Sequence, residues 1–365
     1  MILHNSSNFP IGIDISDLSI KICQINKIGN NVFIQASAKS NLPKGMIEDS
    51  RIVKKEELGE LIRDLVSNPK IGKFTSTDVA VCLPENKTFV KLITIEKNPN
   101  DIAEVIKIEI EKYIPMAIDE MYFDWQIIKT LPQGQLVLIG AAPKAIVDEY
   151  SQLFDSTGFT VSAFEIESTA ICRALLKEES NKFKDNETGN YGIIDIGEKQ
   201  TSMIVYAAGT ILFTVSMPVS GEMITQKISD TLQIDFAQAE KAKILCGLDK
   251  EKASGVVSDI IDEVISDLVA RIEDVNKFHM YHYSEYGKIN KLLLCGGGSN
   301  ILDLHHTLKK RLGIEVEIGN TLNNLTGKEI INGSPFSKKI VRLENEPGWA
   351  TAIGLALRGV FVDEI

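Results

Sequence analysis

The chain contains the stretch Ile11-Gly12-Ile13-Asp14-Ile15, an apolar run with one carboxylate near its end. A similar stretch, Ile193-Ile194-Asp195-Ile196-Gly197, lies in the second half of the chain. Short apolar runs that end in Gly, Ser or Asp are typical of buried strands followed by turns. Each stretch therefore predicts a strand that presents an aspartate at its end. Two such aspartates suit a metal-bound phosphate held between two halves of a protein.

The similarity extends over a whole strand-turn-strand module. In the first half the apolar runs predict strands at 11–15, 19–25 and 32–38, and in the second half at 191–196, 201–206 and 211–216. Gly, Asn and polar residues separate the runs in both halves. A repeated module of this length predicts two similar domains that arose by duplication. The length of 365 residues also suits two domains.

Composition limits the class of protein. The 39 basic and 50 acidic residues give a net charge of −11, which argues against a surface for nucleic acid. The five cysteines are widely spaced, without a Cys-x-x-Cys pair, and predict buried thiols in a reducing compartment. No run approaches the length that spans a bilayer, and no basic region followed by an apolar one opens the chain. We expect a cytoplasmic protein that reaches a membrane only through a partner.

Helices are predicted between the strand modules. Apolar residues recur with helical spacing over 56–66, over 101–113, where Pro115 would stop the helix, and over 256–284. A polar stretch at 182–190 is the expected linker between the halves. Strands that alternate with helices place the chain in the α/β class.

A glycine-rich segment, Cys295-Gly296-Gly297-Gly298-Ser299, follows an expected strand at 291–294. Glycines allow backbone N–H groups to approach a ligand closely, and a helix that follows would favour an anion or a polar nucleotide edge. We expect Ser299 or Asn300 to cap that helix. The alternative is a strand-to-helix turn without a ligand.

Each half also offers polar groups for a phosphate. Asp14 suits a metal ion bound through water, and Lys21 suits a phosphate, although Lys21 could also be a solvated strand residue. The second half offers Asp195, the N–H of Gly197 and the hydroxyl of Thr201.

A further pair, Glu240 and Lys243, has the spacing that places two side chains on one helix face. The pair could clamp a ribose and a base, or form a surface salt bridge.

Taken in order, two phosphate loops, an acidic connecting helix, a Gly-rich loop and a small-residue helix near the end resemble the actin-like ATPase superfamily. Within it the chain resembles the PilM family of cytoplasmic type IV pilus assembly proteins. The segments that carry this resemblance are 109–126, 138–150, 165–174 and 350–359.

The resemblance implies a fold of two duplicated RNase H-like domains, with a small α/β insertion subdomain on the first. The implied boundaries are 1–190 for the first domain, with the insertion at about 88–160, then 191–340 for the second domain. Residues 341–365 would form a helix that returns to the first domain.

The resemblance also implies roles for individual residues. Asp14 and Asp195 match the acids that face Mg²⁺, and Lys21 matches the phosphate lysine. The remaining matches are Gly197 and Thr201 in the second phosphate loop, Glu240 and Lys243 at the adenosine, Gly296, Gly297 and Gly298 in the adenosine loop, and Glu167 at the position that orients the attacking water. Glu167 could instead serve as a helix cap or hinge residue.

Three positions in the two loops depart from the family pattern. Ser16 stands where the family usually has Gly, although it can still offer its N–H and hydroxyl, and Asp17 and Glu198 add carboxylates to the two loops. A carboxylate near phosphate oxygens is repulsive by about 1 kcal/mol or more. Asp17 could instead help to hold Mg²⁺. We therefore expect weak, strongly Mg²⁺-dependent ATP binding with slow or absent turnover.

The implied partner is the cytoplasmic N-terminal tail of the inner-membrane protein PilN, held beside the insertion subdomain. Other inner-membrane proteins of the pilus machine are further expected partners. The protein could also form a homodimer. The alternatives are a small-molecule kinase of the same superfamily and an actin-like scaffold without a nucleotide.

Overall fold

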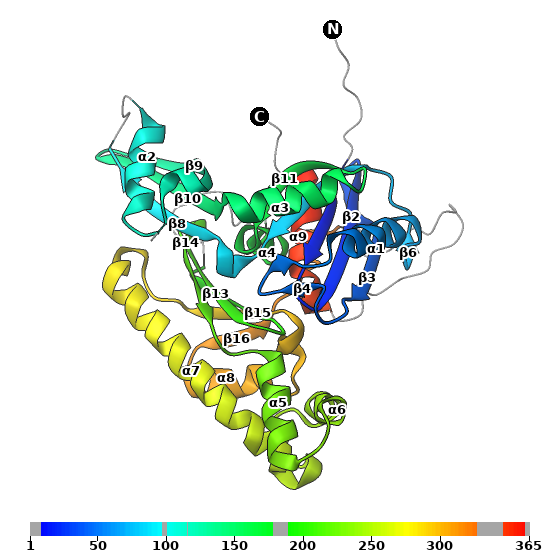
Figure 1. Ribbon diagram of the computed structural model, residues 1–365. Coiled ribbons are helices and arrows are strands. Elements are labelled where there is room, and N and C mark those ends of the chain that lie inside the picture. Colours follow the sequence, from blue (N-terminus) through cyan, green and yellow to red (C-terminus); the bar gives the residue numbers. More distant parts are fainter. Residues whose placement is uncertain (1–8, 97–100, 115, 178–188, 327–345, 362–365) are drawn as a thin grey trace. The chain divides into compact units, whose positions relative to one another are not determined.

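A computed structural model describes residues 9–96, 101–114, 116–177, 189–326 and 346–361 (Figure 1). The described residues form two compact units, one within 9–177, 321–326 and 349–361 and one within 189–320 and 346–348. Strands and helices alternate in both units, so the prediction of an α/β chain is confirmed. Among the described helices, none combines the length and the apolar character needed to cross a membrane.

A mixed six-stranded sheet forms the centre of the first unit, in the order β11-β7-β1-β2-β3-β6. Its strands are β1 (Ile11–Ile15), β2 (Ser19–Ile28), β3 (Asn31–Asn41), β6 (Ile71–Gly72), β7 (Asp78–Leu83) and β11 (Thr160–Ile166). β1 pairs antiparallel with β2 and parallel with β7. The expected hairpin strands are therefore present, and β2 and β3 are longer than the sequence indicated. A small hairpin, β4 (Ile47–Glu48) and β5 (Arg51–Ile52), follows β3.

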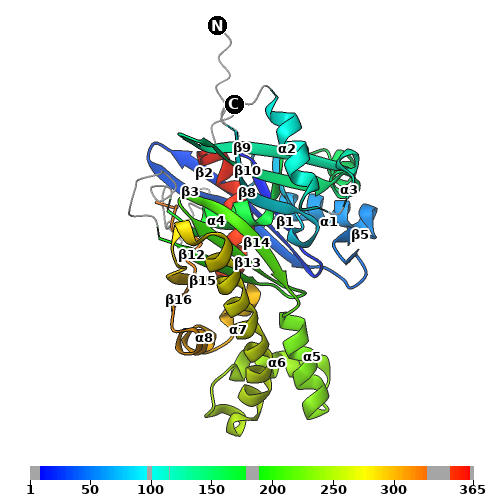
Figure 2. The ribbon, with the colours of Figure 1, turned by 90° about the vertical axis from the view of Figure 1, so that its left-hand side faces the viewer.

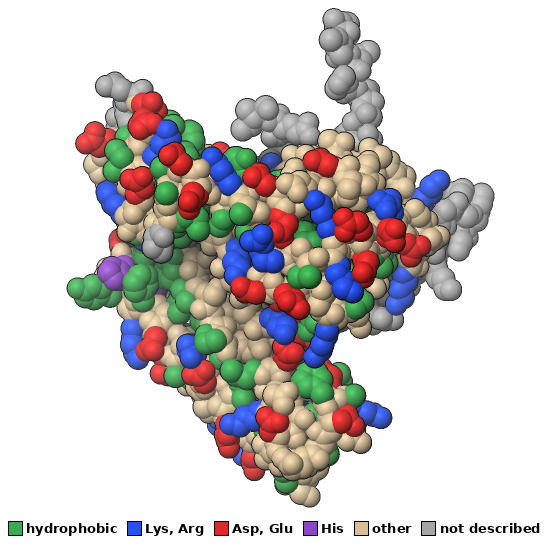
Figure 3. Space-filling model, viewed as in Figure 1, with side chains coloured by type: hydrophobic (Ala, Val, Ile, Leu, Met, Phe, Trp, Pro, Cys, Tyr) green, Lys and Arg blue, Asp and Glu red, His purple; other side chains and the backbone are tan. Residues whose placement is uncertain are grey.

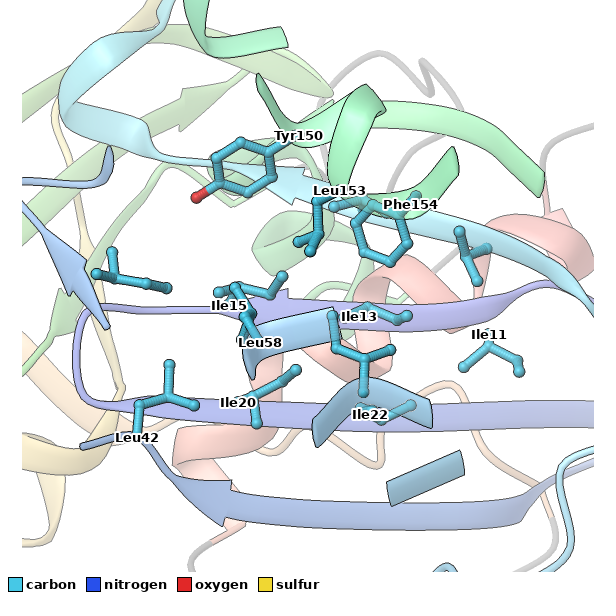
Figure 4. Close-up of a cluster of buried hydrophobic side chains, with 14 of the residues drawn as sticks. Ile11, Ile13, Ile15, Ile20, Ile22, Leu42, Leu58, Tyr150, Leu153 and Phe154 are labelled. Carbon is cyan, nitrogen blue, oxygen red and sulfur yellow. The ribbon is translucent and has the colours of Figure 1, made fainter. Parts of the chain in front are cut away.

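One face of this sheet packs against α1 (Lys55–Ser67) and α3 (Lys144–Asp155). Alternate residues of β1 and β2, from Ile11 to Ile22, meet Leu58 of α1 and Tyr150 and Phe154 of α3 in a buried cluster (Figure 4). Burying a large apolar side chain contributes about 1.5–3 kcal/mol, so this cluster is a main source of stability. The apolar periodicity that predicted α1 reflects this face.

The other face of the sheet carries α4 (Glu167–Leu175) and α9 (Ala350–Ala356), and α10 (Arg358–Phe361) follows (Figures 1 and 2). Gly12 of β1 lies so close to α9 that a Cβ there would be 2.5 Å from the carbonyl oxygen of Ala352. The small residues of α9 thus allow a helix backbone to lie directly on the strand that ends in Asp14.

The first unit also contains strands β8 (Phe89–Ile95), β10 (Gly134–Pro143) and β9 (Met121–Leu131), which pair antiparallel in this order. Helix α2 (Ile102–Glu111) covers them, and Ile106 and Ile110 are buried against the strands. These elements occupy the range expected for an insertion, whereas α3, which the same range includes, contributes to the core of the six-stranded sheet.

The second unit contains β12 (Tyr191–Ile196), β13 (Thr201–Ala207), β14 (Thr210–Met217), β15 (Lys291–Cys295) and β16 (Glu315–Ile318), in the order β16-β15-β12-β13-β14. Its helices are α5 (Gly221–Leu232), α6 (Phe236–Cys246), α7 (Val256–His282) and α8 (Leu304–Leu312). Helices α5, α6 and α7 lie together in both views (Figures 1 and 2). The antiparallel β12–β13–β14 hairpins have the same order as β1–β2–β3, which is the repeat that the sequence indicated.

Buried polar and sulfur-containing side chains occur in both units. His279 is buried in α7 with its Nε2 2.7 Å from the carbonyl oxygen of Gly287, and no group of three potential metal ligands occurs among the described residues. Four of the five cysteines are buried and Cys246 is partly exposed. Most of the expected linker, 182–188, and the stop at Pro115 lie outside the described residues, as do positions 341–345 of the expected final helix.

Candidate functional site

One group of candidate residues lies at the end of β1, in the first unit. Asp14 is two residues from Gly12, so its side chain lies on the sheet face that α9 covers. The β1–β2 pairing places Lys21 directly opposite, and Lys21 Nζ lies 3.2 Å from Asp14 Oδ2. Their side chains are only 15% and 8% exposed, respectively. Lys21 is therefore a largely buried partner of this carboxylate and not a solvated strand residue.

The turn that follows β1 is held by its own hydrogen bonds. The N–H and the hydroxyl of Ser16 both donate to the carbonyl oxygen of Ser19, at 2.9 and 3.0 Å. Ser16 itself is exposed. Asp17 Oδ1 accepts a hydrogen bond from the N–H of Ser50 at 3.1 Å, where Ser50 has a φ of +64° in the β4–β5 hairpin. The additional carboxylate of this loop thus holds a neighbouring turn.

Further carboxylates lie on the same side of the first unit. Burial raises the pKa of the Cys82 thiol well above its usual value, and the negative charges of Glu167, Asp14, Glu85 and Glu165 raise this pKa further. Cys82 lies in β7, beside β1, so these acids surround the ends of the central strands. The structure therefore brings Glu167 and Asp14, two of the sequence-predicted residues, into one electrostatic neighbourhood.

Glu167 is the first residue of α4, and two residues from other segments contact this end of the helix. Glu85 Oε2 accepts a hydrogen bond from the N–H of Ser168 at 3.1 Å, in the first turn of α4. The hydroxyl of Thr351, at the start of α9, donates to Glu167 Oε1 at 3.2 Å.

Sequence reasoning missed both of these residues. Glu85 could have been noticed as a carboxylate two residues beyond a buried strand. No comparable pattern in the sequence singles out Thr351.

A second group of candidate residues lies at the end of β12, in the second unit. Asp195 is followed by a turn in which the N–H of Gly197 donates to the carbonyl oxygen of Gln200 at 2.9 Å. Gly296, after β15, has a φ of +79°, and a Cβ there would lie 2.1 Å from Asp195 Oδ1. The carboxylate therefore lies directly against the glycine-rich loop, and only glycine fits at 296.

The loop after β12 is joined to α5. The N–H groups of Gly221 and Glu222 donate to the carbonyl oxygens of Gly197 and Glu198 at 3.0 and 2.9 Å. These are first-turn N–H groups, which a helix leaves without partners of its own.

A buried lysine joins α6 to the start of α5. Lys243 Nζ donates to the carbonyl oxygen of Gly221 at 3.0 Å and to Thr225 Oγ1 at 2.8 Å, and it lies 2.7 Å from Glu240 Oε2. The Lys243 side chain is only 11% exposed. Glu240 and Lys243 thus share a helix face, as the spacing predicted. Because Lys243 is largely buried and also donates to α5, the pair is not simply a surface salt bridge.

Glu198 adds negative charge beside this pair. Although its side chain reaches solvent, desolvation by the surrounding atoms raises its pKa above the usual value, and the charge of Glu240 raises it further against the lowering effect of Lys243. The second loop therefore carries a carboxylate whose ionisation is disfavoured by its surroundings.

The strand register separates Thr201 from Asp195. Thr201 pairs with Ile196, and Ser202 pairs with Asp195. Directly opposite residues share a face of the sheet, so Ser202, and not Thr201, lies beside the carboxylate, as Lys21 lies beside Asp14. Thr201 is fully buried, and its hydroxyl has no hydrogen-bond partner among the described residues.

The prediction that Ser299 or Asn300 caps a helix was wrong. Residues Gly297–Asn300 form a 3₁₀ turn, and α8 begins only at Leu304, after Asp303 with a φ of +63°. The hydroxyl of Ser299 donates to the carbonyl oxygen of Gly296 at 2.8 Å and is used within its own turn. A Cβ at Gly297 would meet no atom within 4 Å, so the tip of this loop is open.

The predicted site residues therefore form two groups. Asp14, Ser16, Lys21 and Glu167 belong to the first unit. The second unit holds Asp195, Gly197, Thr201, Glu240, Lys243 and the three loop glycines Gly296, Gly297 and Gly298.

Comparisons with known proteins agree with this architecture. The model of a family described as type IV pilus assembly protein PilM matches residues 12–360. The cell division protein FtsA of Buchnera aphidicola subsp. Baizongia pistaciae is 26% identical over 191 residues, a match that covers 45% of this chain and 45% of that protein. The match thus spans less than half of the relative's length.

Solved structures show the same fold. A chain of the PilM-PilN type IV pilus biogenesis complex has a TM-score of 0.79 at 22% identity, covering 97% of this chain and 99% of that chain. The ethanolamine utilization protein EutJ from Carboxydothermus hydrogenoformans has a TM-score of 0.55 at 14% identity, covering 95% of this chain and 89% of its own. MreB5 of Spiroplasma citri bound to AMPPNP has a TM-score of 0.53 at 13% identity, covering 86% of this chain and 92% of that chain.

These similarities establish the actin-like fold that the sequence predicted. The family match extends over nearly the whole chain, including the strand modules of both units. The chain therefore belongs to the PilM family of type IV pilus assembly proteins.

Proposed function

We propose that this protein is a nucleotide-responsive adaptor of the pilus machine, which binds Mg-ATP and the cytoplasmic N-terminal tail of a PilN-like inner-membrane protein. The observation that carries the proposal is the family match over residues 12–360. Binding to the tail would place the protein at the inner face of the membrane, next to the other inner-membrane pilus proteins.

The nucleotide part of the proposal rests on the chemistry of the two half-sites. Asp14 with Lys21, and Asp195 against Gly296, provide carboxylates and a cation at strand ends, and the loop at Gly297 is open. A glycine-rich loop with room at its tip suits an adenosine that approaches the backbone closely. MreB5, which shares the fold, has been solved with AMPPNP bound.

The residues also fit Mg²⁺ that arrives with the phosphates. No cluster of three or more potential metal ligands occurs in the described ranges. Mg²⁺ keeps several waters and is bound by substrate phosphates with one or two carboxylates, so a preformed cage is not required. Asp14 and Asp195 would each accept hydrogen bonds from water on the ion, and the ion would neutralise phosphate charge.

The insertion elements offer a surface for the tail. Ile108 of α2 and Ile127 of β9 are 57% and 46% exposed. Ile127 alternates with Phe123 and Trp125, which pack with α2, so it lies on that face of β9, whereas Tyr122 lies on the opposite face. Figure 3 shows apolar side chains among charged ones over α2 and β9. An extended peptide with apolar anchors suits such a surface.

A titration with the tail tests the adaptor function. The N-terminal peptide of the PilN-like protein from the same genome, labelled with a fluorophore, is titrated with the protein with and without Mg-ATP, and a scrambled peptide is the control. We expect saturable binding of the true peptide, weakened by Ile127→Glu and unchanged by Glu56→Gln on the remote helix α1. Absence of binding in both conditions would remove the adaptor function.

A thermal shift tests the nucleotide function. Mg-ATP should raise the melting temperature because the ligand binds only the folded state. Asp195→Asn should reduce this rise in melting temperature, and ATP in EDTA should produce only a small rise. An equal shift with and without Mg²⁺ would contradict the expected role of the two aspartates.

A further inference from the structure

Two polar contacts converge on the start of α4 from segments that are distant in the sequence. Ile166, the residue before α4, has no side chain that can cap the helix, and the N–H of Ser168 donates instead to Glu85 Oε2 at 3.1 Å. Glu85 is only 4% exposed. A buried carboxylate at this end of a helix satisfies an N–H group and interacts favourably with the helix dipole.

The second contact reaches the Glu167 side chain itself. The hydroxyl of Thr351 donates to Glu167 Oε1 at 3.2 Å, and Thr351 is 5% exposed. Thr351 belongs to α9, whose Gly354 lies directly against the backbone of Ala170 in α4. The distance between the two helices is therefore fixed by backbone contact, and the hydroxyl defines how the carboxylate is rotated.

We propose that Glu85 and Thr351 are positioning residues for Glu167, which set the backbone and the carboxylate orientation of the group that directs water in ATP hydrolysis. The inference rests on the proposed nucleotide function and adds to it a slow hydrolysis that depends on these two contacts.

In the reaction, a water oxygen forms a bond to the γ-phosphorus, the bond from that phosphorus to the bridging oxygen breaks, and the electron pair leaves with ADP. The water proton passes to the Glu167 carboxylate. Most of the catalysis in phosphoryl transfer is placement and charge stabilisation, so a rotated carboxylate lowers the rate without weakening nucleotide binding.

The test separates turnover from binding. Thr351→Val keeps the shape of the side chain and removes the hydroxyl, and it should lower kcat roughly 10- to 100-fold. KM and the Kd for Mg-ATP should stay within about 2-fold. Thr351→Ser restores a hydroxyl and should recover most of the rate.

Glu85→Gln keeps an oxygen that can accept from the Ser168 N–H and should retain more activity than Glu85→Ala. Thr157→Val is the matched control, because it removes a buried hydroxyl that donates to the Phe154 carbonyl oxygen at 2.7 Å, at the end of α3. It should leave kcat unchanged. If Glu85→Ala does not fold, the Thr351 variants alone test the positioning role.

The outcomes distinguish this inference from the function on which it rests. Wild-type kcat in Thr351→Val overturns the positioning role, and so does an equal loss in Thr351→Val and Thr351→Ser that follows a lower melting temperature. A wild-type protein that binds Mg-ATP without turnover also overturns it and leaves the proposed function intact. A protein that binds no Mg-ATP in calorimetry removes both.

Discussion

At the scale of single residues, the buried carboxylate of Glu165 is paired with two arginines. Glu165 Oε2 lies 2.8 Å from Arg173 Nη1, and Oε1 lies 2.5 Å from Arg358 Nη1. Burial alone would raise the pKa of Glu165, but the two guanidinium groups outweigh it and lower the pKa below the usual 4.5. The pairing joins β11 to α4 and α10, and it stabilises the sheet face next to the first half-site.

This pairing predicts a specific pH dependence. Because the folded-state pKa is lowered, the stabilisation is present above about pH 4.5 and is lost as pH falls through the folded pKa. Glu165→Gln should lower the free energy of unfolding near neutral pH by about 3 kcal/mol, since it leaves the largely buried guanidinium of Arg173 without its anion. Urea unfolding of both proteins across this range should show a flatter profile for the variant. Parallel profiles would contradict the assignment.

For Glu198 we expect the opposite effect of pH on the stability of the folded state. Its pKa is raised from 4.5, so its charge destabilises the folded state above the folded pKa, and this effect is absent below about pH 4.5. Glu198→Gln should therefore be more stable than wild type near neutral pH, with a difference that disappears in acid.

The same variant should bind Mg-ATP roughly fivefold more tightly, because a repulsion of about 1 kcal/mol with the phosphates is removed. Calorimetry at fixed Mg²⁺ measures this, and Glu251→Gln, an exposed acid of the same unit, is the control. Unchanged affinity would show that Glu198 does not face the nucleotide.

At the scale of elements, α9 depends on small residues for its place on the sheet. A Cβ at Gly354 would lie 1.8 Å from the carbonyl oxygen of Ala170, in the backbone of α4, which cannot move aside as a side chain could. Gly354→Ala should therefore lower the free energy of unfolding by about 3 kcal/mol or prevent folding.

Gly59→Ala in α1 is the matched control for this substitution. A Cβ at Gly59 meets its nearest atom, in the Thr157 side chain, at 3.4 Å, and alanine favours a helix by about 1 kcal/mol. The control should be neutral or stabilising by urea unfolding. Equal effects of the two substitutions would contradict the close approach of α9 and α4.

At the scale of the whole molecule, the net charge affects how the protein associates with a lipid membrane. The net charge is −11, and on the face drawn in Figure 3 the basic side chains alternate with acidic ones. Anionic lipid attracts clusters of basic residues, at about 1 kcal/mol for each, so an acidic protein gains little from it. We expect the purified protein not to float with anionic vesicles and to float with vesicles that display the PilN-like tail. Flotation with bare vesicles would contradict recruitment through a partner.

The sequence by itself determined the local elements. The strand modules, α1, α2 and α7 follow from periodicity, because each depends on which residues face the core within one continuous segment. The register that sets Lys21 opposite Asp14 depends on short-range geometry, since an antiparallel hairpin sets its own register, although the sequence analysis did not predict this ion pair. The resemblance of the whole chain to the PilM family was likewise present in the sequence, and the family match confirms it.

The tertiary structure decided how distant segments meet. The contact of Glu85 with α4 spans 83 positions and that of Thr351 with Glu167 spans 184, and no periodicity reports such contacts. The start of α8 at Leu304 depends on a loop that uses the hydroxyl of Ser299 internally. Local pattern records which face of an element is buried, whereas only packing in three dimensions selects the partner on that face.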